Sequence, residues 1–466
     1  MAIKDNNWTI ELSNFSAGYS PLAFSDSLTE KGGSGHASAM KNCYVIEDYL
    51  TQGSALSNLT GTLTESIQYI MDKAVSDDVS YAIGTSKLFQ ISSTTISAIH
   101  TITSCTEGES IQVLKGYLYY FYNTASEGRI GKYDLASSFT DSSATGLQVA
   151  PHPSDKKEDI MVFGNGRYAG VYLANSDTLD VEKLDFGDDV EVADVIYNAG
   201  YWYIAVNSGV SGTNRNEGQI YLYDGSALSN LLEDESGVGM FRIGFLYRIN
   251  GIVYVAYQDL SSTGFIIGYL NNKAIMPLVR YTGDLPTFAQ KTLFKNTILF
   301  LSGGSAYSAG AIVGELPFQL SQIFDGGYST ATAISAPFGT PIVASTEGSS
   351  YRIAKTSGYD VNCTWNSIVF PLSNGKYKGM IDDIIVITKT LGEDASCSLT
   401  ILGDQATLTS TAKTITGTDK RRHYFNTIGL VPLEDMQVAL DWAGGSASNA
   451  CAIRRIIING HWVESI

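Results

Sequence analysis

One strand pattern recurs through the middle of this chain and restricts how the chain can fold. In each copy, an apolar run is followed by a tight Gly or Asn turn, an aromatic run, a polar loop and a strand of the form G-x-I-x-x-Y. Each copy has an apolar sheet face that it cannot bury alone, so neighbouring copies must pack against one another. The four clear copies begin with the runs Val113–Tyr122, Val195–Ile204, Leu246–Val255 and Thr292–Leu301.

The spacing of the turns predicts the architecture. Weaker copies turn near Gly84, Gly164 and Gly339. With them, the seven turns are about 42 residues apart on average, which is the length of a four-stranded propeller blade. We therefore predict a β-propeller of six to eight blades, with seven favoured, over residues 76–362. The alternative is an ordinary meander whose hairpins resemble one another only because they share turn chemistry.

The composition favours an all-β chain. Gly (46 residues) and Tyr (28 residues) are abundant, and aromatic and β-branched residues form short alternating runs. Helical proteins are instead rich in Ala, Leu, Glu and Lys. One segment, residues 64–74, has helical spacing, because Ile67, Ile70 and Met71 would share one helix face, and there we predict a short helix. No apolar run approaches the roughly 18 residues of a transmembrane helix, so we predict no transmembrane segment.

The two flanks differ from the repeat. Residues 1–75 contain many Gly residues and no copy of the pattern, and we predict an extended N-terminal arm that includes the short helix. Residues 363–466 contain more strongly apolar strand-like runs, typical of a β-sandwich, which we predict to be jelly-roll-like. These C-terminal residues carry 9 basic and 10 acidic side chains, whereas the whole chain has a net charge of −17. The surplus negative charge therefore belongs to the arm and the propeller, and it argues against sequence-specific binding of nucleic acid.

A search for reactive motifs yields no catalytic residue, no cofactor-binding residue and no metal ligand set. Phosphate loops, EF-hand loops and paired histidines at ligand spacing do not occur in the sequence. The acidic stretch 185–194 is typical of a solvated loop and strand edge, with a divalent-cation site as the alternative. A glycan-cleaving propeller would need two converging carboxylates, and nothing in the sequence pairs the candidates near predicted strand ends. We predict that the chain is not an enzyme. These candidates are Asp134, Asp159, Asp259 and Glu315.

One basic cluster could contact a partner. A solvated hairpin tip is the simplest interpretation, and contact with a phosphate or an acidic partner is the alternative. The residues of this cluster are Lys420, Arg421, Arg422, Arg454 and Arg455.

The two ends of the chain resemble a family of phage proteins. Asn14–Pro21 (NFSAGYSP) and Lys41–Leu56 (KNCYVIEDYLTQGSAL) are similar to the "N-F-x-G-G" and "A-x-N-v-d-v…L-x-x-R-x-G" segments that open the tail-nozzle or packaged-DNA-stabilising propeller proteins of tailed phages. This chain has Gln52-Gly53 where that family often has Arg-x-Gly. Residues 363–466 resemble the sandwich appendage of the same family.

The resemblance implies a structural role in a virion. The expected function is that of a tail-associated component, such as a nozzle, an adaptor or a tail tip, assembled as a multimer in the host cytoplasm. Its expected partners are other virion structural proteins and copies of itself, and no catalytic residues carry over from the family. The alternative is a carbohydrate-binding propeller that recognises host-surface glycans or another receptor.

Overall fold

The protein is all-β, as predicted, in the residues that the structure describes. The structure is a computed structural model. None of its described helices is long and apolar enough to cross a membrane. The described residues are 7–15, 33–34, 37–46, 49–209, 218–231, 241–259, 264–281, 283–294, 297–310, 319–324, 330–360, 362–373, 376–426, 428, 431–443 and 445–464.

The chain forms two compact units, and neither is continuous in sequence. The propeller unit comprises residues 58–306 and 328–355, and the sandwich unit comprises residues 1–57, 307–327 and 356–466.

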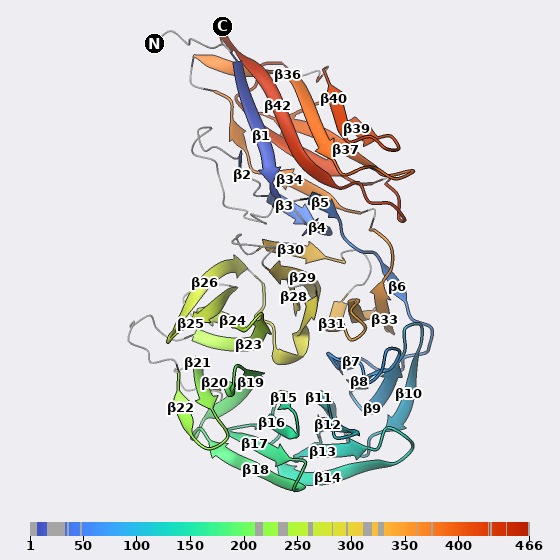
Figure 1. Ribbon diagram of the computed structural model, residues 1–466, viewed down its shortest axis with the longest axis vertical. Coiled ribbons are helices and arrows are strands. Elements are labelled where there is room, and N and C mark those ends of the chain that lie inside the picture. The colour runs from blue at the N-terminus through green and yellow to red at the C-terminus, as the bar shows by residue number, and fades with distance from the viewer. Residues whose placement is uncertain are drawn as a thin grey trace. The chain divides into compact units, whose positions relative to one another are not determined.

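The described residues of the propeller form seven blades, the number favoured by the repeat spacing; six blades are separate four-stranded sheets, and one consists of three strands of a larger sheet. Figure 1 shows them around a common centre. The first strand of each blade is innermost, because it neighbours the first strands of the adjoining blades. Blade by blade, the strands are β7 (Ile67–Ile70), β8 (Ser80–Gly84), β9 (Lys87–Ile91) and β10 (Ile96–Thr101); β11 (Glu107–Leu114), β12 (Tyr117–Asn123), β13 (Gly128–Tyr133) and β14 (Phe139–Leu147); β15 (Ser154–Lys157), β16 (Ile160–Asn165), β17 (Tyr168–Leu173) and β18 (Thr178–Asp185); β19 (Val190–Asn198), β20 (Tyr201–Ser208), β21 (Gly218–Tyr223) and β22 (Leu228–Asn230); β23 (Phe241–Ile249), β24 (Ile252–Asp259), β25 (Phe265–Asn271) and β26 (Ala274–Tyr281); β27 (Lys291–Phe294), β28 (Thr297–Ser302) and β29 (Ser305–Gly310); and β31 (Thr330–Ser335), β32 (Ile342–Glu347), β33 (Ser350–Thr356) and β6 (Leu56–Asn58).

Turn chemistry explains why the repeat was visible in the sequence. Lys115-Gly116, Ala199-Gly200 and Asn250-Gly251 each join the first two strands of a blade, and both residues of each pair have positive φ. Two-residue turns of this kind match the twist of the strands they connect. The predicted turns near residues 85 and 166 join the second and third strands instead, so the seven turns are not all equivalent.

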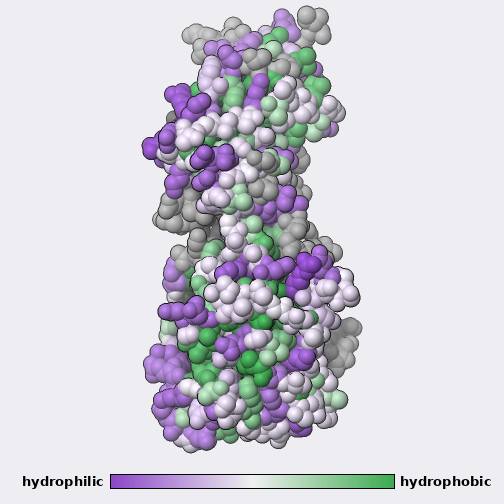
Figure 2. Space-filling view, turned by 90° about the vertical axis from the view of Figure 1, so that its right-hand side faces the viewer, coloured by the Kyte–Doolittle hydropathy of each residue, from purple (hydrophilic) through white to green (hydrophobic). Residues whose placement is uncertain are grey.

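Apolar clusters between neighbouring blades hold the ring together. The first and last blades share one such cluster, in which Phe89 and Ile91 pack with Ala333 and Ile342. The last blade takes its fourth strand, β6, from the chain that precedes the first blade. Next to β6, the Leu59 N–H donates to the Ile353 carbonyl (2.9 Å) and the Leu59 side chain is buried in the same cluster. Hydrophobic residues also reach the surface of the propeller between hydrophilic ones (Figure 2).

The predicted helix at residues 64–74 is wrong. The segment contains strand β7, the innermost strand of the first blade. A β-bulge shifts its register between Ile67 and Tyr69, so Ile67, Tyr69 and Ile70 are all buried around the intervening Gln68. The bulge interrupts the period of two and produces the i, i+3 spacing of Ile67 and Ile70 that imitates a helix.

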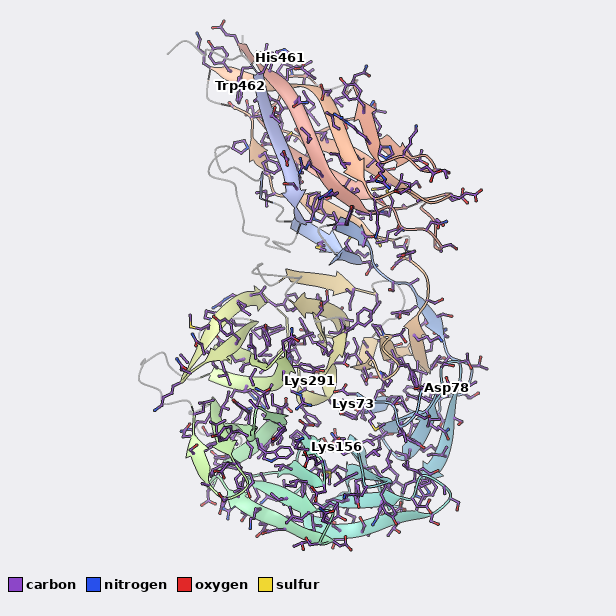
Figure 3. All side chains as sticks on the ribbon, in the orientation of Figure 1. Lys73, Asp78, Lys156, Lys291, His461 and Trp462 are labelled. Atoms are coloured by element: carbon purple, nitrogen blue, oxygen red, sulfur yellow. The ribbon has the colours of Figure 1, made fainter. Side chains whose placement is uncertain are left out.

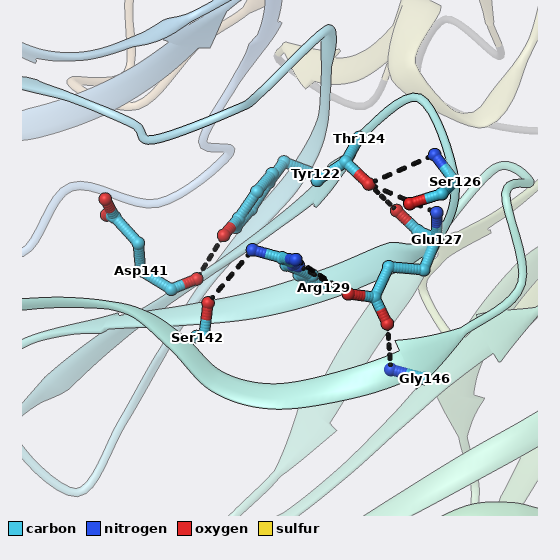
Figure 4. Close-up of polar contacts among 8 residues, drawn as sticks. All are labelled: Tyr122, Thr124, Ser126, Glu127, Arg129, Asp141, Ser142 and Gly146. Carbon is cyan, nitrogen blue, oxygen red and sulfur yellow. Dashed lines mark hydrogen bonds and ion pairs between the residues drawn. The ribbon is translucent and has the colours of Figure 1, made fainter.

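Side-chain contacts stabilise β14, the outer strand of the second blade, where its pairing with β13 is irregular. β14 pairs with β13 through two register shifts. The Glu127 carboxylate accepts from the Gly146 N–H (2.9 Å) and from the Arg129 guanidinium, which also donates to Ser142 Oγ (3.3 Å) (Figure 4). These contacts connect Glu127 and Arg129 to two residues of β14.

The sandwich unit consists of two sheets with one core between them. Leu12, Ile384 and Ile456 from the first sheet pack in the same cluster as Trp365 and Val438 from the second. The strands of the first sheet are β1 (Asn7–Asn14), β2 (Gly33–Ser34), β4 (Cys43–Ile46), β5 (Tyr49–Gln52), β36 (Tyr377–Thr388), β40 (Arg422–Phe425) and β42 (Ile453–Glu464), and those of the second are β3 (Ala37–Lys41), β30 (Gln319–Ile323), β34 (Thr364–Ser367), β35 (Phe370–Pro371), β37 (Ser396–Gly403), β38 (Leu408–Thr409), β39 (Lys413–Thr416) and β41 (Asp435–Asp441).

The N-terminal segment is extended, but its described residues are built into the sandwich. β1 runs antiparallel to β42 from Asn7↔His461 to Leu12↔Ile456, and the Phe15 ring meets the Trp365 ring edge-on at 5.3 Å. The predicted domains 1–75, 76–362 and 363–466 therefore differ from the observed units. The reason is that apolar residues of β1 complete a core that the C-terminal residues do not fill alone.

Candidate axial binding pocket

A pocket of about 580 Å³ lies on the axis of the propeller. All seven blades or the loops leading into them contribute to its wall, which places it where the innermost strands begin. Its polar side chains are Gln68, Glu107, Glu109, Asn123, Glu191, Asn207, Arg242, Gln258, Thr287, Gln290 and Thr332.

β-bulges build much of this wall. Five innermost strands shift register near the end that borders the pocket, and the residue between the shifted pairs lines the pocket in every case. A bulge leaves one residue unpaired and turns its side chain away from the regular alternation. The repeated bulge is therefore the local feature that directs side chains to the axis. The five residues are Gln68, Glu109, Ala193, Gly244 and Thr332.

Glu109 is a buried carboxyl group in the pocket wall. Its side chain is 8% exposed, and Asn123 Nδ2 donates to Glu109 Oε1 (2.8 Å) and to the Ala150 carbonyl (3.1 Å). Burial raises the pKa of Glu109 well above its usual range, and the negative charges of Glu107 and Glu191 raise it further. Asn123 therefore fixes a carboxyl group that binds a proton more readily than a surface glutamate does.

Glu191 and Arg242 face the same pocket. Burial raises the pKa of Glu191, and the positive charge of Arg242 lowers it. The pocket wall thus holds three carboxyl groups, from Glu107, Glu109 and Glu191, and one guanidinium group.

A histidine supports the wall from behind. His152 is fully buried, its Nδ1 lies 2.9 Å from the Gly164 carbonyl oxygen and its Nε2 lies 3.2 Å from Asn123 Oδ1. Burial lowers the pKa of His152 to about 4. The imidazole is therefore neutral at pH 7, so it has one proton and donates to only one of these two oxygens.

The loop before the sixth blade closes one side of the pocket. The short 3-10 helix Phe288–Gln290 lies in this loop, and Gln290 Oε1 accepts from the Thr287 N–H (3.1 Å). Gly244 lets the loop approach the fifth blade, because a Cβ atom at this position would lie 2.1 Å from the Pro286 carbonyl oxygen.

These pocket residues were not among the predicted site residues, although the sequence contains a signal for some of them. Asn123, Asn207 and Gln258 lie at or near the ends of β12, β20 and β24, the same place in three copies of the repeat. Asn207 also joins two blades, since its Nδ2 donates to the Ile243 carbonyl and its Oδ1 accepts from the Ile243 N–H, both at 2.8 Å. Aligning the copies residue by residue would have shown this recurrent amide.

Further along the axis, buried charges are paired. The Lys291 ammonium donates to Asp194 Oδ2 and to the Leu246 carbonyl (2.6 Å), and both charged side chains are buried. Figure 3 shows Lys291 with Lys73 and Lys156 near the middle of the propeller.

Asp194 belongs to the acidic stretch 185–194, for which a divalent-cation site was the alternative prediction. No group of three or more metal-ligating side chains occurs in the part of the chain that the structure describes.

The predicted basic cluster lies on the first sheet of the sandwich unit. Arg422 and Arg455 both pair in register with Ile387, so they occupy one row across β40, β36 and β42. Arg455 forms an ion pair with Glu11 (3.2 Å). Lys420 and Arg421 precede β40 and are exposed, as is Arg454, which lies beside a register shift in β42.

The two predicted carboxylate candidates whose side chains the structure describes each have hydrogen-bond partners of their own. Asp134 accepts from three backbone N–H groups of residues 136–138, and these bonds lower its pKa to about 2. Asp159 accepts from the Asn175 amide. The Asp259 side chain and Glu315 lie outside the described residues.

No protein-family model and no curated protein matches this sequence. Among solved structures, the chain is similar to the extracellular domains of two putative hybrid two-component systems from B. thetaiotaomicron. One is 12% identical, with a TM-score of 0.48 over 73% of this chain and 43% of that chain, and the other is 12% identical, with a TM-score of 0.46 over 80% and 49%. The chain thus spans less than half the length of either. It is also similar to the Neurospora crassa Pan2 WD40 domain, at 10% identity and a TM-score of 0.41 over 63% of this chain and 89% of that one. Similarities at these identities and TM-scores assign no family and no function to this chain.

Proposed function

We propose that this chain is a structural component of a bacteriophage tail, as a nozzle, an adaptor or a tail tip, and that it assembles as a multimer in the virion. One observation carries the proposal: the two end segments that resemble the phage family fold into one unit. Phe15 of the first resembling segment meets the Trp365 ring edge-on, and β5 from the second resembling segment pairs with β42 through Leu50↔Ile453. Residues 16–21 of the first segment lie outside the described residues.

The basic row offers a contact surface for this assembly. Arg422 and Arg455 stand on one row of the first sheet, in a unit whose C-terminal residues 363–466 are nearly neutral. The rest of the chain is strongly acidic, so a neighbouring copy has complementary charge to offer to this row. The proposal gives the chain no catalytic step.

Electron microscopy and mass photometry of the purified protein test the assembly. We expect a ring-shaped multimer for the wild type and a shift toward monomers for the double variant Arg422→Glu/Arg455→Glu. Lys413→Glu, on the second sheet, is the control and should assemble normally. A wild-type protein that stays monomeric at micromolar concentration and is absent from purified virions would contradict the proposal.

A second candidate function is recognition of host-surface glycans by the propeller, and the axial pocket favours it. Amide, carboxyl and hydroxyl side chains converge on this pocket, and these groups form hydrogen bonds with sugar hydroxyls. A glycan array probed with the full chain tests this function. We expect binding by the wild type and weaker binding by Gln258→Ala. Cleavage of a saccharide would instead indicate an enzyme.

A further inference from the structure

We propose that the axial pocket binds a single sugar residue that carries a protonated amino group. This inference rests on the second candidate function, glycan recognition, and specifies the ligand of the same pocket.

The volume and position of the pocket fit one small molecule. Its volume of about 580 Å³ lies within the range of small-molecule sites, about 300–1,000 Å³. The wall comes from the ring of innermost strands, which the apolar clusters between blades hold in place. A ligand here meets a preformed wall and would not have to order a mobile surface.

The neutral polar groups of the wall are suited to sugar hydroxyls. Gln68 and Gln258 each offer an amide donor and an amide acceptor, and they come from two different blades. Thr332 Oγ1 is shielded from solvent and has no hydrogen-bond partner among the described residues.

The charged groups of the wall select a cation. Glu107, Glu109 and Glu191 contribute three carboxyl groups and Arg242 contributes one opposing charge. Glu107 and Glu191 both raise the pKa of Glu109, which means that their negative charges repel a negative charge on this buried carboxyl group. A ligand ammonium would relieve this repulsion, whereas an anionic ligand would add to it.

Calorimetric titration of the full chain with three monosaccharides tests the inference. Glucosamine carries the ammonium, glucose replaces it with a hydroxyl, and N-acetylglucosamine keeps the nitrogen but removes its charge. We expect glucosamine to bind at least about 10-fold more tightly than the other two, because a hydrogen bond to a charged group is stronger than a neutral one.

A charge-neutral variant tests the effect of the carboxyl charge on binding while it keeps the shape of the side chain. Glu191→Gln is nearly isosteric, and we expect it to bind glucosamine no more tightly than glucose. Glu158→Gln removes an exposed carboxyl group outside the pocket and should keep the preference. Thermal unfolding of both variants verifies that they are folded.

The possible results distinguish a failure of the amino-sugar inference from a failure of glycan recognition, the function on which it rests. Equal binding of glucosamine and glucose by the wild type would overturn the amino-sugar inference, and the glycan array would still report on glycan recognition. A preference for glucosamine that Glu191→Gln retains would also overturn it, because the pocket carboxyl group would then not be its source.

Discussion

His152 shows how a single buried residue links the pocket wall to pH. The ring has no exposed surface, and burial lowers its pKa from 6.5 to about 4. Above pH 6.5 the imidazole is neutral in both the folded and the unfolded chain, so its titration does not affect stability there. Below that pH the unfolded chain takes up a proton that the folded chain refuses until about pH 4. The free energy of unfolding therefore falls as the pH falls from 6.5 to 4.

We predict that His152→Gln abolishes this part of the acid sensitivity. At pH 7 the variant should be less stable than the wild type by about 1–3 kcal/mol, because it loses packing and a hydrogen bond. On acidification toward pH 4 the wild type should lose up to about 3 kcal/mol that the variant does not lose. Urea unfolding at pH 7 and pH 4.5 measures both, with His461→Gln as a more exposed control. A stability difference that does not change with pH would contradict the prediction.

At the scale of strands, the hairpin turns could be predicted from the sequence, but the β-bulges could not. Turns such as Asn250-Gly251 require positive φ at both residues, so their sequence is constrained and the repeat is visible. A bulge has no such signature, since its extra residue is Gln68 in one blade and Glu109 or Ala193 in others. For this reason the sequence indicates the blades but not the pocket, and the segment that forms β7 has the spacing of a helix.

The strand that closes the ring of blades could not be predicted from the sequence either. β6 completes the last blade with residues that lie far from it in sequence, and a pattern read along the chain does not reveal such a pairing. The basic cluster was visible in the sequence because both of its segments, 420–422 and 454–455, are runs of adjacent basic residues. Its alignment in one row depends on the register of β36 with β40 and β42, which no local pattern specifies.

We predict that Leu59→Ala weakens the closure of the propeller. Leu59 is 7% exposed and packs with residues of the first and last blades. Removing a buried leucine side chain typically costs about 2–5 kcal/mol. Thermal unfolding should shift to lower temperature, and proteolysis should cut the first or last blade earlier. Asn58→Ala changes the exposed preceding residue and should leave both measurements unaltered. Equal effects of the two variants would argue against a role of Leu59 in closure.

For the whole molecule, the charge distribution limits the partners. The net charge of −17 falls almost entirely before residue 363. An acidic surface repels nucleic acid, as a passage for DNA would need to do. We predict that the full chain does not shift double-stranded DNA in a low-salt gel at micromolar concentration. A salt-sensitive shift by the wild type would contradict this, and loss of that shift in Arg422→Glu/Arg455→Glu would assign the contact to the basic row.

The discontinuity of the sandwich unit leads to a prediction about how the chain can be divided. Ile10, Leu12 and Phe15 belong to the same buried core as Ile456 and Trp365, and β1 covers one edge of β42. A fragment of residues 363–466, cut at the boundary predicted from the sequence, would lose these apolar contacts and expose that edge, which favours aggregation.

We expect this fragment to be insoluble or partly unfolded when it is produced alone. A single chain that joins residues 356–466 to residues 1–57 through a flexible linker should restore a cooperative thermal transition, because it supplies β1, β3, β4 and β5 together. The same fusion with Leu12→Asp and Phe15→Asp is the control, since it keeps the length of the chain and removes two apolar contacts with the core. Cooperative unfolding of residues 363–466 alone, with a transition as high as that of the fusion, would mean that the N-terminal strands are accessory. Residues 363–466 would then be an independent domain. The two chain ends that resemble the phage family would lie together in the fold without depending on each other to fold.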